Sequence, residues 1–458
     1  MTVPTLPLLT HGDPLAPFAY RSGRTITVAD FLADVAALAV LLPPGRHLLN
    51  LCVDRYRFTV GLAAAMSAGR ISLLPSTHTP ESLRQMRAFA PDVFCLRDGG
   101  EADDELPVLR YPELHGAAAG VAALPVPRFA AEQTVAYVFT SGSTGAPQPH
   151  AKSWGALVSC VRAGARRLGL LDGRAYTLVG TVPPQHMYGF ESTVLLALQS
   201  GAALWAGKPF YAADIAAALA AVPAPRVMVS TPFHLRAFLE EFGEEGGGMC
   251  PPLHATLSAT APLSVALAQS VEHFSAAPLL EIYGCTESGQ LATRRPVQGG
   301  EWQLLDDVRM RQEAETTLVE GGHVEGCVPL GDIIEITGAD RFVLHGRSGD
   351  MVNIAGKRTS LGFLNHQLLA IDGVRDGVFF LPDSDADSGR VQRLAALVVA
   401  PGLSSDAIAQ ALRESLDPVF LPRPLLLADS LPRNAAGKLP RGDLLALFER
   451  LRAQGAQR

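Results

Sequence analysis

The stretch Tyr137-Val138-Phe139-Thr140-Ser141-Gly142-Ser143-Thr144-Gly145-Ala146-Pro147 joins a predicted strand to a glycine-rich turn. Its apolar first half continues from Val135 and predicts a buried strand. Gly142 and Gly145 allow the following turn to approach a ligand closely. Hydroxyls and bare N–H groups in such a turn favour a nest for anions, above all the phosphates of a nucleotide. A flexible serine–glycine linker is the alternative, and the turn lacks the Gly-Lys-Ser/Thr ending of a Walker A loop.

Composition limits the number of domains, the class of partner and the location that we expect. The chain has 458 residues, enough for two or more domains, and its net charge of −7 argues against nucleic acid as a partner. Its six cysteines are scattered, without a Cys-x-x-Cys pair, which favours neither a metal site nor a disulfide framework. We expect a cytoplasmic protein, because no secretory signal opens the sequence and no apolar run is long enough to be an integral membrane segment.

The first 130 residues alternate helical and strand-like patterns. Residues 27–42 and 58–68 predict helices, and 47–53 and 71–75 predict strands. This βαβ order indicates parallel strands covered by helices. A smaller set of helix and strand patterns follows residue 350. The predicted fold class is therefore α/β, with a large N-terminal domain of mixed and parallel sheets with helices and a small, mobile C-terminal α+β domain.

Three later segments have polar residues suited to nucleotide chemistry. Glu287 lies in a polar turn after a short strand, and a single hard carboxylate suits Mg²⁺, which holds the phosphates while pyrophosphate leaves. Asp332 could accept hydrogen bonds from both hydroxyls of a ribose. Lys438, in a loop near the C-terminus, could supply a mobile point charge. Each of these residues also has an ordinary explanation. Glu287 and Asp332 could be turn residues without a ligand, and Lys438 could be an exposed surface lysine.

Together these segments resemble the adenylate-forming superfamily, which includes acyl- and aryl-CoA synthetases, nonribosomal peptide synthetase adenylation domains and luciferases. The matching stretches are the glycine-rich turn, Pro183–Phe190, Leu257–Ser264, Leu279–Gly289 and Leu431–Arg441, within about two-thirds of the chain. The resemblance implies that ATP activates a carboxylic acid as an acyl-AMP, which a thiol then attacks. One departure is Gln148, where the family usually has lysine. His150 and Lys152 lie close enough in sequence to substitute for it.

The resemblance also implies roles for individual residues. For ATP it implies Thr140, Ser141, Gly142, Ser143, Thr144, Gly145, Tyr283, Gly284, Asp332 and Arg347. For catalysis it implies Lys438, Thr286, Glu287 and His186, with Glu287 holding Mg²⁺. For the acid it implies a pocket lined by His186, Tyr188, Gly189, Phe190, Ser258, Ala259, Thr260 and Cys285.

The resemblance places a hinge at Gly349 and Asp350. We therefore expect a large adenylation domain over residues 1–348 and a small domain over 349–458. After adenylation the small domain would rotate about Gly349, since glycine tolerates a large backbone rotation.

A narrower resemblance concerns the acid and the thiol. The Ser-Gly-Ser-Thr-Gly-x-Pro-Gln-Pro-His loop and the Asn-Ile-x-Gly-Lys-Arg stretch look like the ligases of aryl polyene and xanthomonadin pathways. Those enzymes load a hydroxybenzoate-like acid onto an acyl carrier protein. Two alternatives stay open. One is a CoA ligase for a fatty or aryl acid, and the other is a non-catalytic relative that binds nucleotide or an acyl group.

Overall fold

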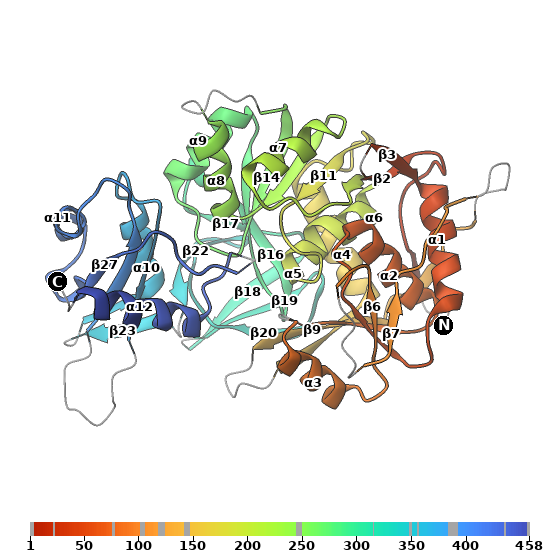
Figure 1. Cartoon of the computed structure of the whole chain (residues 1–458), viewed down its shortest axis with the longest axis horizontal. Helices are drawn as coiled ribbons and strands as arrows, with labels where there is room; N and C mark the ends of the chain where they lie inside the picture. Colours follow the sequence, from red (N-terminus) through yellow and green to blue (C-terminus); the bar gives the residue numbers. More distant parts are fainter. Residues whose placement is uncertain are drawn as a thin grey trace.

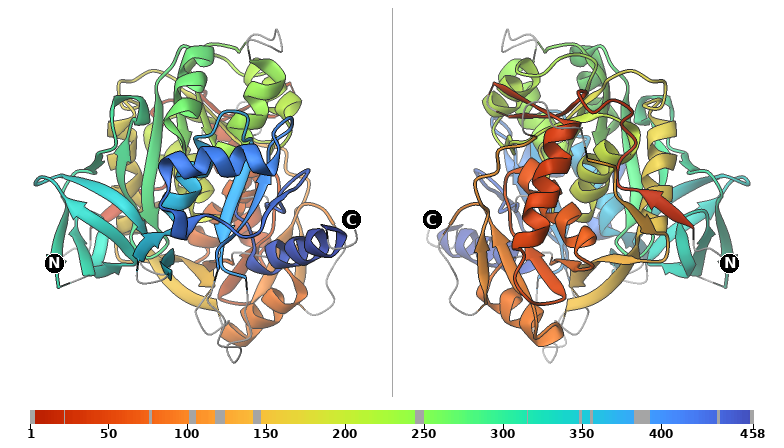
Figure 2. Two further views of the ribbon diagram at one scale, coloured as in Figure 1. Left: turned by 90° about the vertical axis from the view of Figure 1, so that its left-hand side faces the viewer. Right: turned by 90° about the vertical axis from the view of Figure 1, so that its right-hand side faces the viewer.

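The computed structural model describes residues 4–21, 23–75, 78–100, 106–117, 124–141, 147–243, 250–314, 316–347, 350–354, 357–382, 393–434 and 437–455. In these ranges, residues up to 347 build two large sheets, and residues 350–455 gather at one end of the molecule, at the left of Figure 1. The side views in Figure 2 show the same small body against the larger one.

The first large sheet has the order β10-β9-β5-β4-β6-β7. Its strands are β4 (His47–Asn50), β5 (Ile71–Leu74), β6 (Phe94–Arg97), β7 (Val108–Arg110), β9 (Thr134–Ser141) and β10 (Pro147–Ser153). All neighbours pair in parallel except β9 and β10. The helices α2 (Arg55–Ser67) and α3 (Pro80–Phe89) connect β4 to β5 and β5 to β6. The βαβ pattern read from the sequence is therefore confirmed.

The second large sheet has the order β21-β22-β17-β16-β15-β14-β13-β11-β12-β2-β3. Its centre is the parallel run β12 (Ala203–Trp205), β11 (Thr177–Gly180), β13 (Arg226–Ser230), β14 (Leu253–Ser258) and β15 (Leu279–Cys285). Antiparallel strands extend one side: β16 (Gly289–Arg294), β17 (Trp302–Leu304), β22 (Arg341–Arg347) and β21 (Asp332–Ile336). On the other side lie β2 (Pro17–Arg21) and β3 (Arg24–Thr27). This mixed sheet confirms the predicted fold class.

Smaller elements complete the large domain. The short strands β1 (Thr5–Pro7) and β8 (Arg128–Ala130) pair with each other, and β18 (Val308–Glu313), β19 (Thr316–Gly321) and β20 (Val324–Leu330) form an antiparallel sheet. The other α-helices of this part are α1 (Val28–Leu41), α4 (Trp154–Arg167), α5 (Met187–Gly189), α6 (Leu196–Ser200), α7 (Ala212–Ala220), α8 (Pro232–Phe242) and α9 (Val265–Ser275). None of the helices in the described ranges combines the length and the apolar character needed to cross a bilayer.

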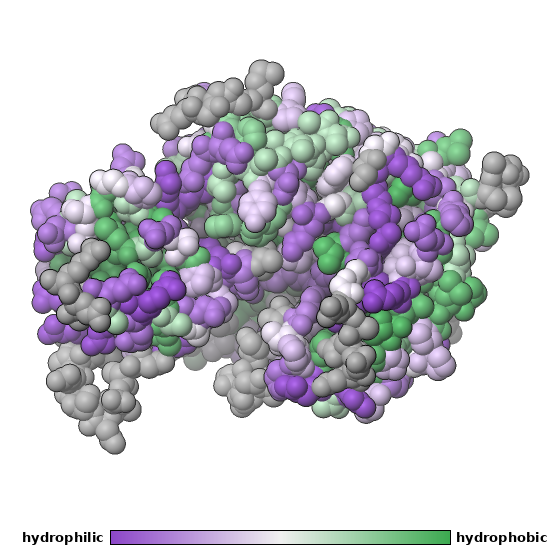
Figure 3. Space-filling model, viewed as in Figure 1, coloured by the Kyte–Doolittle hydropathy of each residue, from purple (hydrophilic) through white to green (hydrophobic). Residues whose placement is uncertain are grey.

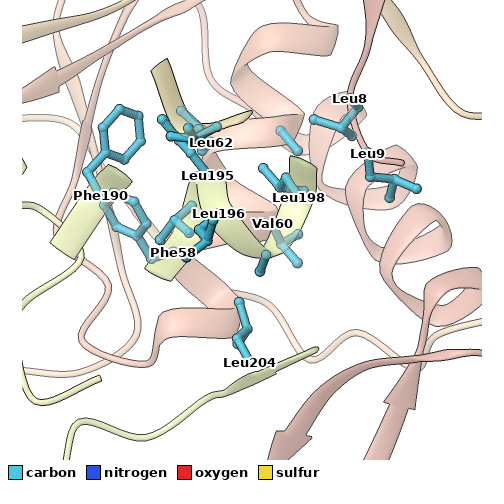
Figure 4. Packing of buried hydrophobic residues seen from close by; sticks show 14 of the residues in the cluster. Leu8, Leu9, Phe58, Val60, Leu62, Phe190, Leu195, Leu196, Leu198 and Leu204 are labelled. Atoms are coloured by element: carbon cyan, nitrogen blue, oxygen red, sulfur yellow. The ribbon is translucent and has the colours of Figure 1, made fainter. Parts of the chain in front are cut away.

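The main core lies where the two large sheets and the helices between them meet. The side chains that point into it include Phe58 on α2, Phe190 and Leu195 on the segment after α5, Leu196 and Leu198 on α6, and Leu204 on β12 (Figure 4). These side chains are nearly or fully buried. Burying an aliphatic or aromatic side chain of this size contributes about 1.5–3 kcal/mol. Apolar packing therefore fixes α2 between strands of both sheets.

A buried arginine at the start of α2 adds polar bonds to this junction. Arg55 is fully buried and donates hydrogen bonds to the Oγ1 of Thr193 and to the carbonyl oxygens of Gly180, Val182 and Gly207, at 2.7–3.1 Å. Gly180 is the last residue of β11, and Val182 and Gly207 lie just after β11 and β12, where carbonyl oxygens beyond the strand pairing need donors. One guanidinium thus ties the first sheet to the carboxyl ends of strands in the second.

Residues 350–455 have cores of their own. The strand pair β23 (Met351–Ile354) and β24 (Lys357–Ser360) precedes α10 (Leu361–Leu369), and β25 (Asp376–Phe380), β26 (Ala395–Val399) and β27 (Leu425–Leu427) form a sheet. The helices α11 (Ser405–Ser415) and α12 (Arg441–Gly455) pack on it, and two buried apolar clusters contain only residues of this region. On the face drawn in Figure 3, hydrophilic residues are spread over both parts of the molecule.

The predicted hinge falls at the join between these parts. Ser348 and Gly349 lie outside the described residues, and Asp350 comes directly before β23. The domain boundary and the hinge therefore stay predictions.

Candidate functional site

The predicted phosphate loop starts at the end of β9. Thr140 and Ser141 are its last strand residues, whereas Gly142, Ser143, Thr144 and Gly145 lie outside the described residues. The chain returns as β10, which pairs antiparallel with β9. Residues two apart in a strand share a face, so Gln148, His150 and Lys152 lie on one face of β10. Burial increases along it: Gln148 is exposed, His150 is half-buried and Lys152 is buried.

His150 and Lys152 reach the turn that carries Glu287. The Nε2 of His150 lies 3.0 Å from the Oγ1 of Thr140 and 3.5 Å from the Oε1 of Glu287. The buried Lys152 donates from Nζ to the backbone oxygen of Glu287 at 2.8 Å. Desolvation lowers the pKa of His150, with the charge of Lys152 acting in the same direction and that of Glu287 against it. The structure thus joins the β9–β10 strand pair to the β15–β16 turn through the two residues that the sequence offered in place of the loop lysine.

The turn between β15 and β16 presents Thr286 and Glu287. Thr286 is half-buried, and the side chain of Glu287 is 40% exposed, so its carboxylate is open to a ligand. Among the described residues no group of three or more His, Cys, Asp or Glu side chains could hold a metal ion. A single accessible carboxylate fits Mg²⁺ when the substrate phosphates and water complete its coordination.

Tyr283 and Asp332 meet beside this turn. The Tyr283 hydroxyl donates to the Oδ2 of Asp332 at 2.6 Å, and its ring packs on Trp302 and Phe342 with centroids 5.6 and 5.4 Å away. Gly284 has no room for a Cβ, which would lie 2.2 Å from the oxygen of Gly289. The predicted adenine and ribose residues are therefore neighbours.

Arg347 closes this group from the end of β22. It is the backbone partner of Asp332 across the β21–β22 pair. Its position is therefore compatible with the predicted role at the ribose or phosphates, although its side chain lies outside the described features.

The Pro183–Phe190 segment turns sharply into α5. His186 accepts the backbone N–H of Tyr188 at its Nδ1, 3.3 Å away. Gly189 is required because a Cβ there would lie 2.0 Å from the oxygen of Pro183. Desolvation, together with the positive charge of Lys438, lowers the pKa of His186 to about 3. His186 is therefore neutral at neutral pH, and Lys438 lies near enough to affect it.

Two predicted pocket residues have structural roles. The Tyr188 hydroxyl donates to the backbone oxygen of Ser230 at 3.1 Å, and its ring is buried. Phe190 is fully buried and packs edge-on against Phe58 in the main core, with centroids 6.4 Å apart (Figure 4). We therefore assign Phe190 to the core rather than to the pocket wall.

The remaining predicted pocket residues lie at the ends of neighbouring strands. Ser258 is the last residue of β14, and its buried hydroxyl has no hydrogen-bond partner within the described ranges. Ala259 is buried, and Thr260 has a φ of +78°. On β15, the Sγ of Cys285 lies 3.1 Å from the Oγ of Ser288. These strands pair in parallel, so their carboxyl ends lie at one edge of the sheet.

A buried polar cluster behind this edge was not predicted. Glu191 is buried in the irregular helix that follows α5, and the Cys160 thiol donates to its Oε1 at 3.3 Å. Burial raises the pKa of Glu191 to about 7, against the opposing charge of Lys152. His323 borders the same space beside Gly289 as Glu191 and Cys160, and desolvation lowers the pKa of this buried histidine to about 4. An acidic residue inside the apolar run 187–198 was the signal in the sequence.

Lys438 lies in a short loop that hydrogen bonds and an ion pair hold in place. Asn434 and Lys438 exchange hydrogen bonds, with the Lys438 N–H on the Asn434 Oδ1 at 3.0 Å. Arg433 anchors the loop by a bidentate ion pair with Asp376 of β25, at 2.7 Å for each bond. The Lys438 side chain itself is exposed.

This loop touches the large domain at the start of α8. A Cβ added to Gly437 would lie 3.4 Å from the Oγ1 of Thr231. Nearby, Arg236 donates to the oxygen of Val374 at 3.1 Å. The structure therefore brings the Lys438 loop against the start of α8, and the charge of Lys438 acts on His186.

Comparisons with known proteins agree with this arrangement. Residues 10–308 match the AMP-binding enzyme family. The chain is 32% identical to a 4-coumarate--CoA ligase of Rhodobacter capsulatus over 295 residues, covering 62% of this chain and 73% of the relative. It is 25% identical to a 4-chlorobenzoate--CoA ligase of a Pseudomonas species over 472 residues, covering 94% and 85%.

Solved structures give the same fold. O-succinylbenzoate Coenzyme A Synthetase (MenE) from Bacillus subtilis, in complex with AMP, has a TM-score of 0.78 at 17% identity, covering 96% of this chain and 98% of that chain. ATP-bound MatB from Rhodopseudomonas palustris has a TM-score of 0.78 at 18% identity, covering 96% and 97%. The family match, the fold and the curated relatives together show that this chain belongs to the AMP-binding enzyme family and is an acid–thiol ligase that uses ATP.

Proposed function

We propose that the protein ligates an aryl acid to CoA through an acyl-AMP intermediate. The observation that carries this proposal is the approach of the Lys438 loop to His186, with Thr140, His150 and Glu287 gathered on the large domain. In adenylation the acid's carboxylate attacks the α-phosphorus of ATP and pyrophosphate leaves. The accumulating negative charge needs cations on more than one side.

Each charged group has a distinct task in this mechanism. Lys438 would neutralise the acid's carboxylate and the α-phosphate, because the neutral His186 cannot supply a charge. Glu287 would hold Mg²⁺, which offsets the charge of the departing pyrophosphate. His150 would orient Thr140 or a phosphate oxygen where the family usually has a lysine. The small domain would then rotate about the predicted hinge so that the thiol can reach the acyl-AMP.

The choice of aryl acid and CoA is supported by the relatives. A 4-coumarate--CoA ligase and a 4-chlorobenzoate--CoA ligase are both similar to this chain over most of their lengths. The narrower resemblance instead predicts a hydroxybenzoate as the acid and an acyl carrier protein as the acceptor. Both fit the same two-step chemistry, and the experiment below tests each of them separately.

The experiment measures acid-dependent ATP–pyrophosphate exchange with benzoates, hydroxybenzoates, cinnamates and fatty acids of graded length. Exchange with aryl acids alone is expected, and a preference for fatty acids would contradict the aryl assignment. The best acid is then presented with CoA or with a phosphopantetheinylated carrier protein. Faster thioester formation on the carrier protein would replace CoA as the acceptor. Absence of exchange with every acid, in protein that binds ATP, would favour the non-catalytic alternative.

A further inference from the structure

Lys152 is a buried lysine on β10, beside the turn that carries Glu287. Its exposed fraction is 5%, and its Nζ donates to the backbone oxygen of Glu287 at 2.8 Å. Burying an ammonium group costs free energy unless hydrogen bonds and an opposite charge compensate it. An apolar side chain of similar volume would often cost less at such a place. The contact with the turn therefore explains the position of Lys152 better than packing does.

The opposing acidic group near Lys152 is Glu191. Glu191 is buried as well, and desolvation raises its pKa while the charge of Lys152 acts against that change. A Cβ added to Gly289 would lie 2.8 Å from the Oε1 of Glu191, so this carboxyl group lies against the end of the turn. Lys152 and Glu191 are therefore electrostatically coupled, and each of them borders the turn, one at Glu287 and the other at Gly289.

The strand that follows the turn is tied to the same region. Gln290, in β16, donates from its Nε2 to the Oγ of Ser192 at 3.1 Å, and Ser192 follows Glu191 in the chain. β16 also pairs antiparallel with β15, the strand that enters the turn. The turn is therefore held at its two ends by paired strands, and Lys152 holds it at Glu287, between those ends.

β10 also reaches the side chain of Glu287. His150 lies on the same face of β10 as Lys152, and its Nε2 is 3.5 Å from the Oε1 of Glu287. A glutamate side chain has several rotatable bonds, so an unrestrained carboxylate samples many directions. Lys152 holds the backbone of Glu287 and His150 approaches its carboxylate, and together they reduce that sampling. Two residues of one strand thus direct the Glu287 carboxylate.

Lys152 is poorly placed to contact a phosphate itself. The position at which the family usually has lysine is that of Gln148, which is exposed near the start of β10. Lys152 lies four residues further along the strand, is buried and directs its Nζ to a backbone oxygen. The ammonium group of Lys152 is therefore used within the protein rather than on the nucleotide.

We propose that Lys152 is a positioning residue for adenylation, which holds the turn so that the Glu287 carboxylate meets the metal ion of MgATP. The inference rests on the proposed function, in which Glu287 holds Mg²⁺. Mg²⁺ demands near-ideal octahedral geometry, so a small displacement of the carboxylate weakens the contact. Replacing a residue that orients a metal ligand typically changes metal affinity or activity by about 10- to 100-fold.

The test compares the full chain with its Lys152→Met variant, which keeps most of the side-chain volume and removes the ammonium group. Calorimetry measures the Kd for ATP in Mg²⁺ and in EDTA. We expect the Kd in Mg²⁺ to rise about tenfold and the Kd in EDTA to stay within about twofold, because only the metal contact depends on Glu287. An unchanged Kd in Mg²⁺ would overturn the inference. An equal rise in EDTA would make Lys152 a phosphate contact and would also overturn it.

A double variant separates positioning from charge balance and guards against a folding defect. Lys152→Met alone leaves Glu191 buried without its opposite charge, whereas Lys152→Met/Glu191→Gln removes both charged groups. The double variant should be no less stable to urea than Lys152→Met, and its Kd for ATP in Mg²⁺ should still be raised about tenfold. Recovery of the ordinary Kd in the double variant would show that Lys152 only balances charge, which would overturn the inference.

A matched control removes a charged donor from another backbone oxygen. Arg226, at the start of β13, donates from its Nε to the oxygen of Val222 at 2.9 Å, and Arg226→Met should leave both Kd values unchanged. An equal loss in this control would show a general charge effect and would overturn the inference.

The exchange assay separates this inference from the proposed function. The Mg²⁺ concentration that gives half-maximal exchange should rise about tenfold in Lys152→Met. If no acid supports exchange in the unaltered protein but ATP binding in Mg²⁺ still depends on Lys152, the positioning role stands and the proposed ligase reaction falls. If the unaltered protein exchanges normally and Lys152→Met keeps its Mg²⁺ dependence, the ligase reaction stands and the positioning role falls.

Discussion

Glu287 and Lys438, the two charged residues of the proposed site, are held in different ways. The turn that carries Glu287 lies between paired strands, and the buried Lys152 bonds its backbone. The loop of Lys438 is well anchored within its own domain through Arg433, yet it meets the large domain through few described contacts. In the proposed mechanism the large domain would thus offer a fixed half of the site, and the small domain would carry in a half that the predicted hinge lets it withdraw.

The difference predicts that Lys438 matters for chemistry and little for nucleotide binding. Replacing Lys438 with Ala should lower acid-dependent exchange by on the order of 10²–10³, as expected when one group stabilising transition-state charge is removed. ATP should still bind within a few-fold, because its contacts lie on the large domain. Exchange and ATP affinity are measured on the same protein.

A neighbouring residue gives the control for this prediction. Arg441, exposed near the same loop, is replaced with Ala and should leave exchange within a few-fold of the unaltered protein. Unchanged exchange in Lys438→Ala would remove that lysine from the mechanism. A parallel loss of ATP affinity would mean that the two halves of the site are not separable.

The fixed half depends on the buried Arg55. Replacing Arg55 with Met should lower the free energy of unfolding by about 3 kcal/mol or more, because several buried carbonyl oxygens lose their donor. Urea denaturation measures this change. Arg84→Met, on the exposed surface of α3, is the matched control and should change stability by less than about 0.5 kcal/mol. A similar small change for Arg55→Met would show that the junction relies on apolar packing alone.

Glu191 makes the fixed half sensitive to pH. Burial raises its pKa from an ordinary 4.5 to about 7, so the folded protein binds a proton more tightly than the unfolded chain. Its contribution to stability is complete below pH 4.5 and is lost as the pH rises through about 7. The shift corresponds to on the order of 3 kcal/mol.

The Glu191→Gln variant tests this contribution. The free energy of unfolding of the unaltered protein, relative to that of the variant, should fall between pH 5 and 8. Buried histidines such as His234 act in the opposite direction, since their lowered pKa values remove stability as the pH falls. They are common to both proteins and cancel in the comparison. Parallel pH profiles would show that Glu191 is ionised throughout.

Glu287 should affect the metal requirement more than the fold. Glu287→Gln should raise the Mg²⁺ concentration that gives half-maximal exchange by about tenfold or more, because the amide cannot supply the carboxylate's charge. A second histidine–glutamate pair, His345 with Glu335 at 2.9 Å, is exposed on β22 and β21. Glu335→Gln should leave the Mg²⁺ dependence unchanged. An unaltered requirement in Glu287→Gln would assign the metal to other ligands.

Much of the site on the large domain could be predicted from the sequence, because the patterns that indicate it are short-range. The alternation of helices and strands follows from short-range patterns. So do the positions of Tyr283 in a strand, of Glu287 in the turn after it and of Asp332 at the start of another strand. The contacts of His150 and Lys152 with Glu287 join residues more than 130 positions apart and depend on how two sheets meet. The buried cluster around Glu191 arises in the same way. No short-range periodicity could reveal them.

The contact between the two halves should be the weakest part of the site. Arg375 pairs with Glu240 of α8 at 3.5 Å, with 55% and 43% of their side chains exposed. Arg375→Ala should change the free energy of unfolding by less than about 0.5 kcal/mol and leave exchange within twofold, because exposed ion pairs contribute little. Arg236→Ala should have a larger effect on exchange, since its more buried side chain bonds the small-domain backbone at Val374.

Equal, negligible effects of both variants would mean that ATP and the acid, rather than protein contacts, hold the small domain in place during adenylation. A large effect of Arg375→Ala would contradict the view that the Lys438 half is lightly docked. Either result is read from exchange rates measured at saturating ATP, with urea denaturation to separate docking from folding. We expect the loss of exchange to be largest for Lys438→Ala, much smaller for Arg236→Ala and smallest for Arg375→Ala. In this ranking a few surface contacts hold the small domain against the large one, and the charge of Lys438 supplies the catalytic effect of that contact.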